Sequence, residues 1–268
     1  MIAASMTTLL PILFLASFWL WETFAPARPF ADHRLKHAGN NLALALGNNL
    51  LIGVLFGTAT VLVAEWTETR HAGLTGLLGW SGFWRVVLVI VLLDAAMYVW
   101  HRLNHEIPFL WRFHRMHHTD TRMDVTTATR FHLGEHLGAR LNRLWLIPLI
   151  GASAWEVVLY DLCLLAVTQW HHANVSVGRW DAPLRSILVT PGMHKVHHSE
   201  IRDETNSNYS AVFSWWDRIG RSFRFRDDLG AIRFGLPEFP ERRWQGIWGM
   251  LTTPFVDHPP PESDGEKG

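Results

Sequence analysis

The 268-residue sequence has a single cysteine, few charged residues and no net charge. One cysteine, Cys163, excludes a disulfide scaffold and the cysteine-rich types of zinc or iron–sulfur site. Charged residues make up 18% of the chain, below the roughly 25% of an average soluble domain. The balance of 24 basic and 24 acidic residues gives no reason to expect a nucleic acid partner. No glycine-rich dinucleotide motif and no haem-attachment pattern is present, so electrons for any redox reaction would come from a separate protein.

Three apolar runs are long enough to cross a membrane, which takes roughly 20 residues. They cover residues 6–24, 42–64 and 80–100, and tryptophans lie at their ends, as is typical of membrane interfaces. A fourth apolar region, 144–170, is interrupted by Pro148 and Gly151 and fits a helical hairpin that dips into the bilayer. The sequence therefore predicts an all-α integral membrane protein with about three to four transmembrane helices plus this hairpin.

Basic residues in the short loops predict how the chain is oriented. The loop after the first run contains Arg28, Arg34 and Lys36, and seven arginines lie between residues 101 and 143, whereas the loop at 65–79 has only Arg70. We therefore expect residues 25–41, 101–143 and 171–268 on the cytoplasmic side, with the amino terminus outside. Residues 1–80 form a membrane anchor in this interpretation. A disordered, proline- and acid-rich tail is expected after about residue 255.

Histidines are unusually abundant, and twelve of the 16 lie between residues 101 and 198. One pair is spaced i, i+4 and two triplets follow the pattern His-x-x-His-His, which places each set on one face of a helix. These eight residues are His101, His105, His114, His117, His118, His194, His197 and His198. Eight nitrogens are more than one metal ion accepts, so the spacing predicts a two-metal site in a cytoplasmic helical cap. Imidazole suits zinc, copper, iron and nickel, and two iron ions fit the ligand count.

Isolated histidines and the arginines near the clusters have a simpler interpretation. His33 and His37 are also four residues apart, but no third histidine follows them, and a solvated loop explains both. The arginines could contact lipid phosphates or an electron donor, but a solvated cytoplasmic face is the commoner explanation. This expectation applies to Arg102, Arg112, Arg115 and Arg130.

The segments around the histidines carry a wider resemblance. HRLNH, WRFHRMHHTD and TPGMHKVHHSE, followed by DETNSNYS and SWWDRIG, are similar to the fatty acid hydroxylase/sterol desaturase superfamily. RFHLGEH and WHHAN extend this similarity, which spans roughly residues 19–255. The resemblance implies a catalytic domain of this superfamily at 81–225 and a C-terminal segment at 226–268.

The resemblance also implies which residues bind metal. The implied ligands are His101, His105, His114, His117, His118, His132, His172, His194, His197 and His198. Residues expected to hold these ligands in place are Asp94, Glu135, Asn174 and Asn208. Asp94 also precedes His101 by two helical turns. Leu133 and Gly134 depart from the family pattern beside His132, and His136 and His171 have no clear place in it.

A member of this superfamily would be a membrane-bound di-iron oxygenase. It would hydroxylate or desaturate an unactivated C–H bond of a lipid, such as a sterol or fatty acyl chain, with O2 and with electrons from NAD(P)H. A cytochrome b5-like protein, a ferredoxin or a reductase would deliver those electrons, and no side chain beyond the metal ligands would be catalytic.

Two alternatives remain open, a membrane zinc metallohydrolase and a histidine-rich metal-binding or transport protein. The excess of ligands and the lack of an evident general base argue against the hydrolase. A transporter would place its ionisable groups within the spans, whereas these histidines follow the spans.

Overall fold

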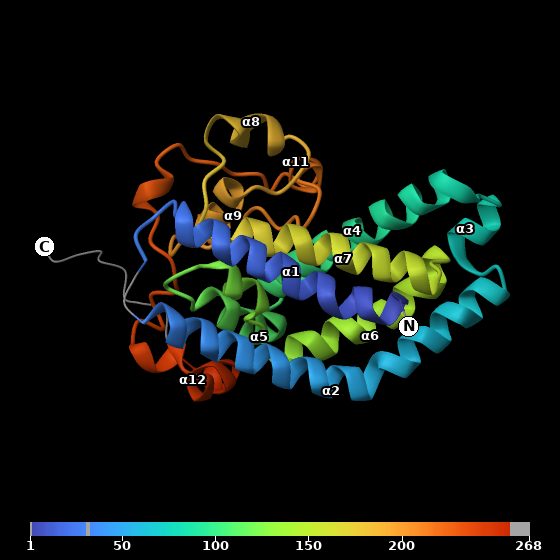
Figure 1. The fold of residues 1–268 in the computed structure, drawn as a ribbon, viewed down its shortest axis with the longest axis horizontal. Helices are drawn as coiled ribbons and strands as arrows, with labels where there is room; N and C mark the ends of the chain where they lie inside the picture. Colours follow the sequence, from blue (N-terminus) through green and yellow to red (C-terminus); the bar gives the residue numbers. More distant parts are fainter. Residues whose placement is uncertain (1, 31–32, 258–268) are drawn as a thin grey trace, which may run out of the picture.

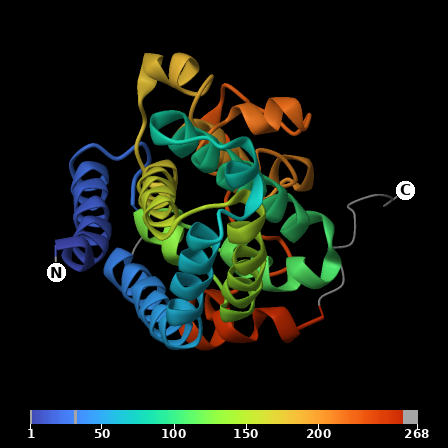
Figure 2. The same ribbon diagram turned by 90° about the vertical axis from the view of Figure 1, so that its right-hand side faces the viewer.

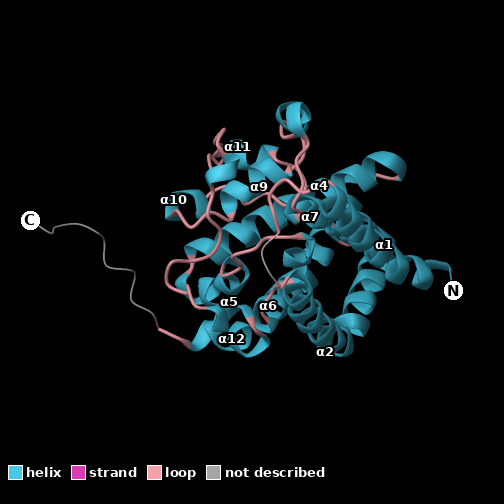
Figure 3. Cartoon of the chain, turned by 60° about the vertical axis from the view of Figure 1, so that its left-hand side comes forward, coloured by secondary structure: helices cyan, strands magenta, loops and turns pink. Residues whose placement is uncertain are grey.

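The computed structural model describes residues 2–30 and 33–257, and the described chain consists of helices joined by loops (Figure 3). The first seven helices are α1 (Ile2–Phe24), α2 (Arg34–Thr69), α3 (Gly73–Leu78), α4 (Gly82–Glu106), α5 (Pro108–His118), α6 (Leu133–Ile150) and α7 (Ala154–His172). The short helices are α8 (Asp181–Leu184), α9 (Pro191–His197), α10 (Arg202–Thr205), α11 (Trp215–Ile219) and α12 (Ile247–Thr252). Single 3-10 turns are η1 (Val125–Thr129), η2 (Gly178–Trp180), η3 (Leu229–Ala231), η4 (Arg242–Gln245) and η5 (Thr253–Phe255). Two isolated bridges are the only β pairing in this part of the chain, so the all-α prediction is confirmed.

Five long helices form an elongated bundle (Figure 1), seen from one end in Figure 2. In it α1 packs on α7, α2 packs on α6, and α4 contacts both α6 and α7. Helix α3 joins α2 to α4 at one end of the bundle. The opposite end carries α5, the 119–132 segment and residues 173–257, which we call the cap.

Two helical stretches, Arg34–Leu78 and Gly82–Glu106, are long and apolar enough to cross a membrane, and Leu9–Phe24 is a shorter apolar helix. Only 17% and 22% of the most apolar stretches of the two long segments are buried inside the protein. Val54, for example, is 84% exposed and Leu50 is 63% exposed. Since so large an apolar surface is unfavourable in water, lipid is its natural environment. Two of the three predicted spans thus lie in these two stretches, and the first, 6–24, lies within α1 (Ile2–Phe24).

Helix α2 is longer than the apolar run within it. It begins at Arg34, so Arg34 and Lys36 belong to the helix, and the predicted loop at 25–41 is correspondingly shorter. The helix carries a buried polar stripe, because His37, Asn41 and Asn48 face the protein interior. Asn48, for instance, donates a hydrogen bond to the carbonyl of Phe131 at 2.7 Å. A helix that faces lipid on one side buries its polar residues on the other.

The region predicted as a helical hairpin contains the end of α6 and most of α7. The chain turns at Gly151, which has a φ of 87°, while Pro148 lies inside α6 and does not break it. A Cβ atom on Gly151 would lie 2.2 Å from the Oγ1 of Thr75, so only glycine allows this close approach to α3. Glu156 then holds the start of α7, since its carboxylate accepts from Ser153 and from Arg85. How deeply this hairpin enters a bilayer stays a prediction.

The apolar core lies among α4, α6 and α7, where Val89, Leu93, Ile147 and Tyr160 are fully buried. The C-terminal segment covers the other side of the cap, since α12 contacts α2 and η5 contacts α5. Ordered structure therefore continues to residue 257, and most of the predicted tail after about residue 255 lies outside the described residues. The boundaries 1–80, 81–225 and 226–268 stay predictions.

Candidate metal centre

A sharp corner between α4 and α5 brings the first histidines together. Helix α4 ends at Glu106, Ile107 adopts an extended conformation, and Pro108 starts α5 at its first position. Proline is well suited there because the first helical residue needs no N–H donor. The corner therefore turns the end of α4, with His101 and His105, towards α5, which carries three more histidines.

The remaining histidines come from the end of α7 and from the short helix α9. His172 is the last residue of α7. Thr190 caps α9 by accepting the N–H of Met193, and Pro191 occupies the first helical position. These two residues fix where the helix starts, and thus which face its histidines share. Helix α9 packs directly against α7.

Nine buried histidines gather into two adjacent groups. We call them the five-histidine group, made of His101, His105, His114, His118 and His197, and the four-histidine group, made of His117, His172, His194 and His198. Within each group the possible ligand atoms lie within 4.8 Å of one another. The groups are neighbours, since the ring centroids of His118 and His198 are 4.7 Å apart. The sets at 101–105, 114–118 and 194–198 therefore come together with His172 at one end of the bundle.

The protons in the five-histidine group are fixed by the surroundings. The Nδ1 atom of His101 lies 2.8 Å from the carbonyl of Tyr209, and a carbonyl can only accept, so Nδ1 carries the proton. Likewise, the Nδ1 of His114 donates to the Glu135 carboxylate at 2.9 Å. Both rings therefore present an Nε2 lone pair, and these two Nε2 atoms lie only 3.1 Å apart. Facing lone pairs repel each other unless a cation lies between them.

The four-histidine group has the same arrangement. His117 donates from Nδ1 to the carbonyl of Arg130 at 3.2 Å, and His172 donates from Nδ1 to the carbonyl of Thr168 at 2.7 Å. Their Nε2 atoms face each other at 3.1 Å. The Nε2 of His194 lies 3.0 Å from that of His172, which adds a third nitrogen to the same point. The arrangement of nitrogens in each group is therefore one that could hold a metal ion.

The spacing of these nitrogens also limits the coordination number. Two nitrogens bound at about 2.1 Å lie roughly 3.0 Å apart in neighbouring positions of a six-coordinate ion and roughly 3.4 Å apart in a tetrahedral one. The facing Nε2 atoms lie 3.0–3.2 Å apart. The donor set thus fits an ion with five or six ligands better than a tetrahedral ion.

Burial keeps these imidazoles neutral, which is the form that binds metal. Removal from water, followed by the charge of neighbouring imidazoles, lowers the pKa of His117, His118, His194 and His198 well below the usual range. Burial likewise lowers the pKa of His197 to about 3. None of these rings needs to lose a proton before it binds an ion at pH 7.

Of the four residues expected to support the ligands, Glu135 contacts a ligand directly, through the hydrogen bond from His114. Asn208 supports the helix that carries the histidines instead, since its side-chain amide donates to the carbonyl of Met193 on α9. Asp94 contacts no histidine and instead accepts from Tyr160, from Trp216 and from the N–H of Phe213. It ties α4 to the loop that precedes α11.

Asn174 also lies against the backbone and not against a ring. Its side chain exchanges two hydrogen bonds with the backbone of Arg28, in the segment after α1. Asp217, a buried residue of α11, accepts the N–H groups of Tyr209 and Ser210. It thereby holds the Tyr209 carbonyl that orients His101. The sequence offers no spacing signal for such backbone acceptors.

His132 is the one implied ligand that lies in neither group. It caps the start of α6, where its Nδ1 accepts the N–H of Gly134, and its Nε2 lies 3.3 Å from the carbonyl of Leu251. A Cβ atom on Gly134 would lie 2.4 Å from the Phe113 ring, so this departure from the family pattern allows the local packing. His136 is also outside, and the His171 ring stacks on that of His194 at 3.8 Å without belonging to a group.

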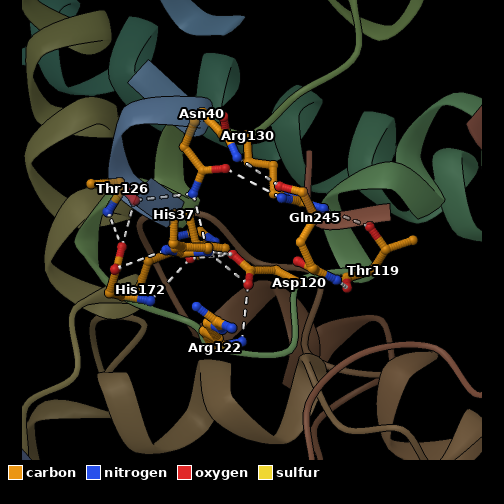
Figure 4. Close-up of polar contacts among 12 residues, drawn as sticks. His37, Asn40, Thr119, Asp120, Arg122, Thr126, Arg130, His172 and Gln245 are labelled. Atoms are coloured by element: carbon orange, nitrogen blue, oxygen red, sulfur yellow. Dashed lines mark hydrogen bonds and ion pairs between the residues drawn. The ribbon is translucent and has the colours of Figure 1, made fainter. Parts of the chain in front are cut away.

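The expectation that His37 lies in a solvated loop is wrong. Its ring is buried in α2 between two carboxylates, with Nε2 2.9 Å from Asp120 (Figure 4). Its Nδ1 lies 3.1 Å from Asp124. Both nitrogens face acceptors, so both donate. Asp120 follows the 114–118 triplet by two residues, and this contact anchors the end of α5 to α2. The signal in the sequence was the polar stripe along α2.

Arg130 is also buried, although a solvated face was expected for it. Its guanidinium donates to the Oγ1 of Thr119, and both residues are labelled in Figure 4. It also donates to Asn41 and to the carbonyls of Met116 and Trp244. Its own carbonyl accepts from His117. Arg130 therefore connects the His117 ring with α2 and with the C-terminal segment.

Comparison with known proteins places these features in a family. The model of the fatty acid hydroxylase family matches residues 86–222. The ornithine lipid hydroxylase of Rhizobium tropici is 32% identical over 88% of this chain and 64% of its own length. Human alkylglycerol monooxygenase is 29% identical over 59% of this chain and 34% of its own length, and rat cholesterol 25-hydroxylase is 20% identical over 50% and 45%. The chain thus spans less than two thirds of these relatives, and no solved structure matches it.

Proposed function

Because the chain belongs to the fatty acid hydroxylase family, we propose that it is a membrane-bound oxygenase that hydroxylates a lipid at a two-iron centre. The observation that supports this most strongly is the set of facing Nε2 lone pairs, which needs a cation in each group. The five-histidine group would hold one iron and the four-histidine group the other, with nine neutral ligands in all.

Ligand type and spacing favour iron over zinc. A catalytic zinc usually takes three protein ligands in a tetrahedral arrangement, whereas these groups offer five and four nitrogens at the spacing of a higher coordination number. Iron accepts imidazole readily and suits reactions with O2. Neutral ligands would also leave the positive charge of the ions uncompensated, which favours binding of reduced oxygen.

The proposed reaction consumes one lipid C–H group, one O2, two electrons and two protons, and yields an alcohol and one water. When bound, the irons would supply the reduction of O2. The protein's own residues would do the rest: the carbonyls of Tyr209 and Arg130 orient two rings, the Glu135 carboxylate makes His114 more basic, and burial keeps water out. We propose that a separate redox protein delivers electrons from NAD(P)H at the cytoplasmic side.

The relatives also guide the choice of reaction. Those compared above are named as hydroxylases or monooxygenases, which supports hydroxylation over desaturation. The relative from Rhizobium tropici, which matches 88% of this chain, is named for ornithine lipid. We therefore propose a membrane lipid with a long alkyl or acyl chain as the substrate class, reached from the bilayer around α2 and α4.

Metal analysis and isotope labelling test this proposal. The purified chain in detergent is expected to hold about two irons, and cells that express it are expected to accumulate lipids with one added atom of ¹⁸O after growth under ¹⁸O2. His117→Ala and His197→Ala should each lose iron and abolish the labelled product, whereas Asp203→Asn, an exposed change in the cap, should retain both. Zinc in place of iron would instead support a hydrolase, and a weakly held, exchangeable metal would support a binding or transport protein.

A further inference from the structure

A second polar site lies on the side of α9 that faces away from the five-histidine and four-histidine groups. A cavity of about 410 Å³ opens between α8 and α9, both labelled in Figure 1, and the segments at 27–28 and 225–230 complete its wall. Lys195 contributes to this wall, whereas its neighbour His194 belongs to the four-histidine group. Successive helical residues point about 100° apart, so α9 can serve both sites at once.

The cavity wall carries an excess of positive charge. Its cations are Arg28, Arg179, Arg185 and Lys195, and its carboxylates are Asp181 and Asp227. Arg185 and Asp181 form an ion pair with each other at 2.6 Å. Asp227 is exposed to solvent. The wall therefore carries two more cations than carboxylates, and its exposed members include both Asp227 and Arg179.

Two of these cations have no carboxylate partner among the described residues. Lys195 is only 5% exposed, and its Nζ donates to the carbonyl of Val175 at 2.8 Å, which leaves two of its three donors for another group. Arg28 donates to the carbonyls of Leu229 and Ile232 and stacks on the Phe234 ring. Asp181 and Glu22 act on Lys195 only at longer range, and each forms a direct ion pair with an arginine instead. An anion in direct contact with Lys195 would therefore stabilise its buried charge further.

The surroundings point to a ligand at the membrane surface. Trp180, which is 59% exposed, and Ile187 lie next to the cavity residues in the chain, and Trp21 and Phe24 end the helix that leads to Arg28. Exposed aromatic residues of this kind are typical of the lipid headgroup region. The volume also exceeds that of a bare ion and lies in the range of small-molecule sites.

We propose that this cavity binds an anionic group, a phosphate or a carboxylate, of the kind that a membrane lipid headgroup carries. Lys195 and Arg28 would contact the anion from the inner wall, and Arg179 from the rim. The proposal is independent of the reaction at the histidines, because it concerns a separate cavity and requires no metal.

Titration calorimetry on the full chain in detergent tests the proposal with three probes: dihexanoyl phosphatidate, neutral dihexanoylglycerol and inorganic phosphate. The phosphatidate is expected to bind and the neutral lipid is not. Lys195→Met and Arg179→Glu should each weaken phosphatidate binding about tenfold or more, as the loss of a charge-assisted hydrogen bond predicts. Arg242→Glu, an exposed change outside the cavity, is the matched control and should bind as the unmodified chain does.

Each result has a defined meaning. Phosphatidate that binds at least tenfold more tightly than inorganic phosphate identifies a lipid headgroup as the occupant, and equal affinities identify free phosphate. Equal binding of the charged and neutral lipids would overturn the proposal. So would unchanged affinity in Arg179→Glu, a rim variant whose folding can be verified by its melting temperature if Lys195→Met proves unstable.

Discussion

Glu135 offers a sharp test of how the five-histidine group is built. Its Oε1 accepts the Nδ1–H of His114, and the Nε2 of His114 faces the Nε2 atoms of both His101 and His118, at 3.1 and 3.2 Å. His114 is therefore the central ring of this group. Glu135→Ala removes the acceptor that fixes its orientation and leaves its Nδ1–H without a partner.

The expected loss follows from similar metal sites. Removal of a hydrogen-bond partner behind a metal-bound histidine lowers metal affinity or activity about 10- to 100-fold, which corresponds to roughly 1.4–2.7 kcal/mol. The loss should concern one ion, because Glu135 contacts no ring of the four-histidine group. Glu135→Gln keeps a carbonyl acceptor for His114 but removes the charge, so we expect a smaller loss.

Chelator titration of the purified chain, followed by metal analysis, measures this effect. The unmodified chain should release two ions at similar chelator concentrations, whereas Glu135→Ala should release one of them at a 10- to 100-fold lower concentration. Asp203→Asn, an exposed acid in the same cap, is the control and should behave as the unmodified chain. If Glu135→Ala retained both ions as tightly, or lost both together, the assignment of His114 to a single group would be refuted.

Three further predictions concern other parts of the site. His132→Asn should retain both metals, because asparagine can also cap α6, whereas His172→Asn should lose one. Loss of metal in His132→Asn would show instead that His132 is a ligand. His37→Ala should lower the free energy of unfolding by about 3–5 kcal/mol, as expected when one partner of a buried ion pair is removed. Chemical denaturation measures this loss, and an unchanged midpoint would contradict the buried contact with Asp120. In the metal-free chain, the pKa of His197 is about 3 when the chain is folded and about 6.5 when it is unfolded. Below pH 6.5 the unfolded state therefore binds a proton that the folded state does not. The free energy of unfolding then falls by about 1.4 kcal/mol per pH unit for this residue alone. Urea midpoints that are equal at pH 7 and pH 5.5 after chelation would argue against neutral, buried rings.

The sequence predicted those features of the site that depend on helical periodicity. Histidines at i, i+3 and i+4 must share a helix face, so the triplets at 114–118 and 194–198 could be recognised without coordinates. The backbone acceptors could not, because the carbonyls of Tyr209, Arg130 and Thr168 are available at any residue and only the fold selects them. His132 shows that a family pattern has limits as well. The pattern names the residue type, but the local turn determines whether that side chain points to the histidine groups.

Errors in α2 arose from hydropathy alone. The apolar run at 42–64 marks the lipid-facing part, but the helix starts eight residues earlier, and its polar stripe turns inward. A search for polar residues on one helical face would have linked His37, Asn41 and Asn48 and placed them opposite the lipid. The error therefore lay in treating the polar start of the helix as a loop.

If the two histidine groups bind metal as proposed, metal binding and folding are coupled in this chain. The two groups draw on α4, α5, α7 and α9, and α9 has only seven residues, which is too short to be stable alone. Without ions, the facing lone pairs of His117, His172 and His194 would push α9 away from α7. With ions, the free energy of metal binding opposes this separation and holds the cap against the membrane bundle. Loss of metal should therefore disorder α9 before it affects the long helices, and hydrogen exchange after chelation should detect this difference along the chain.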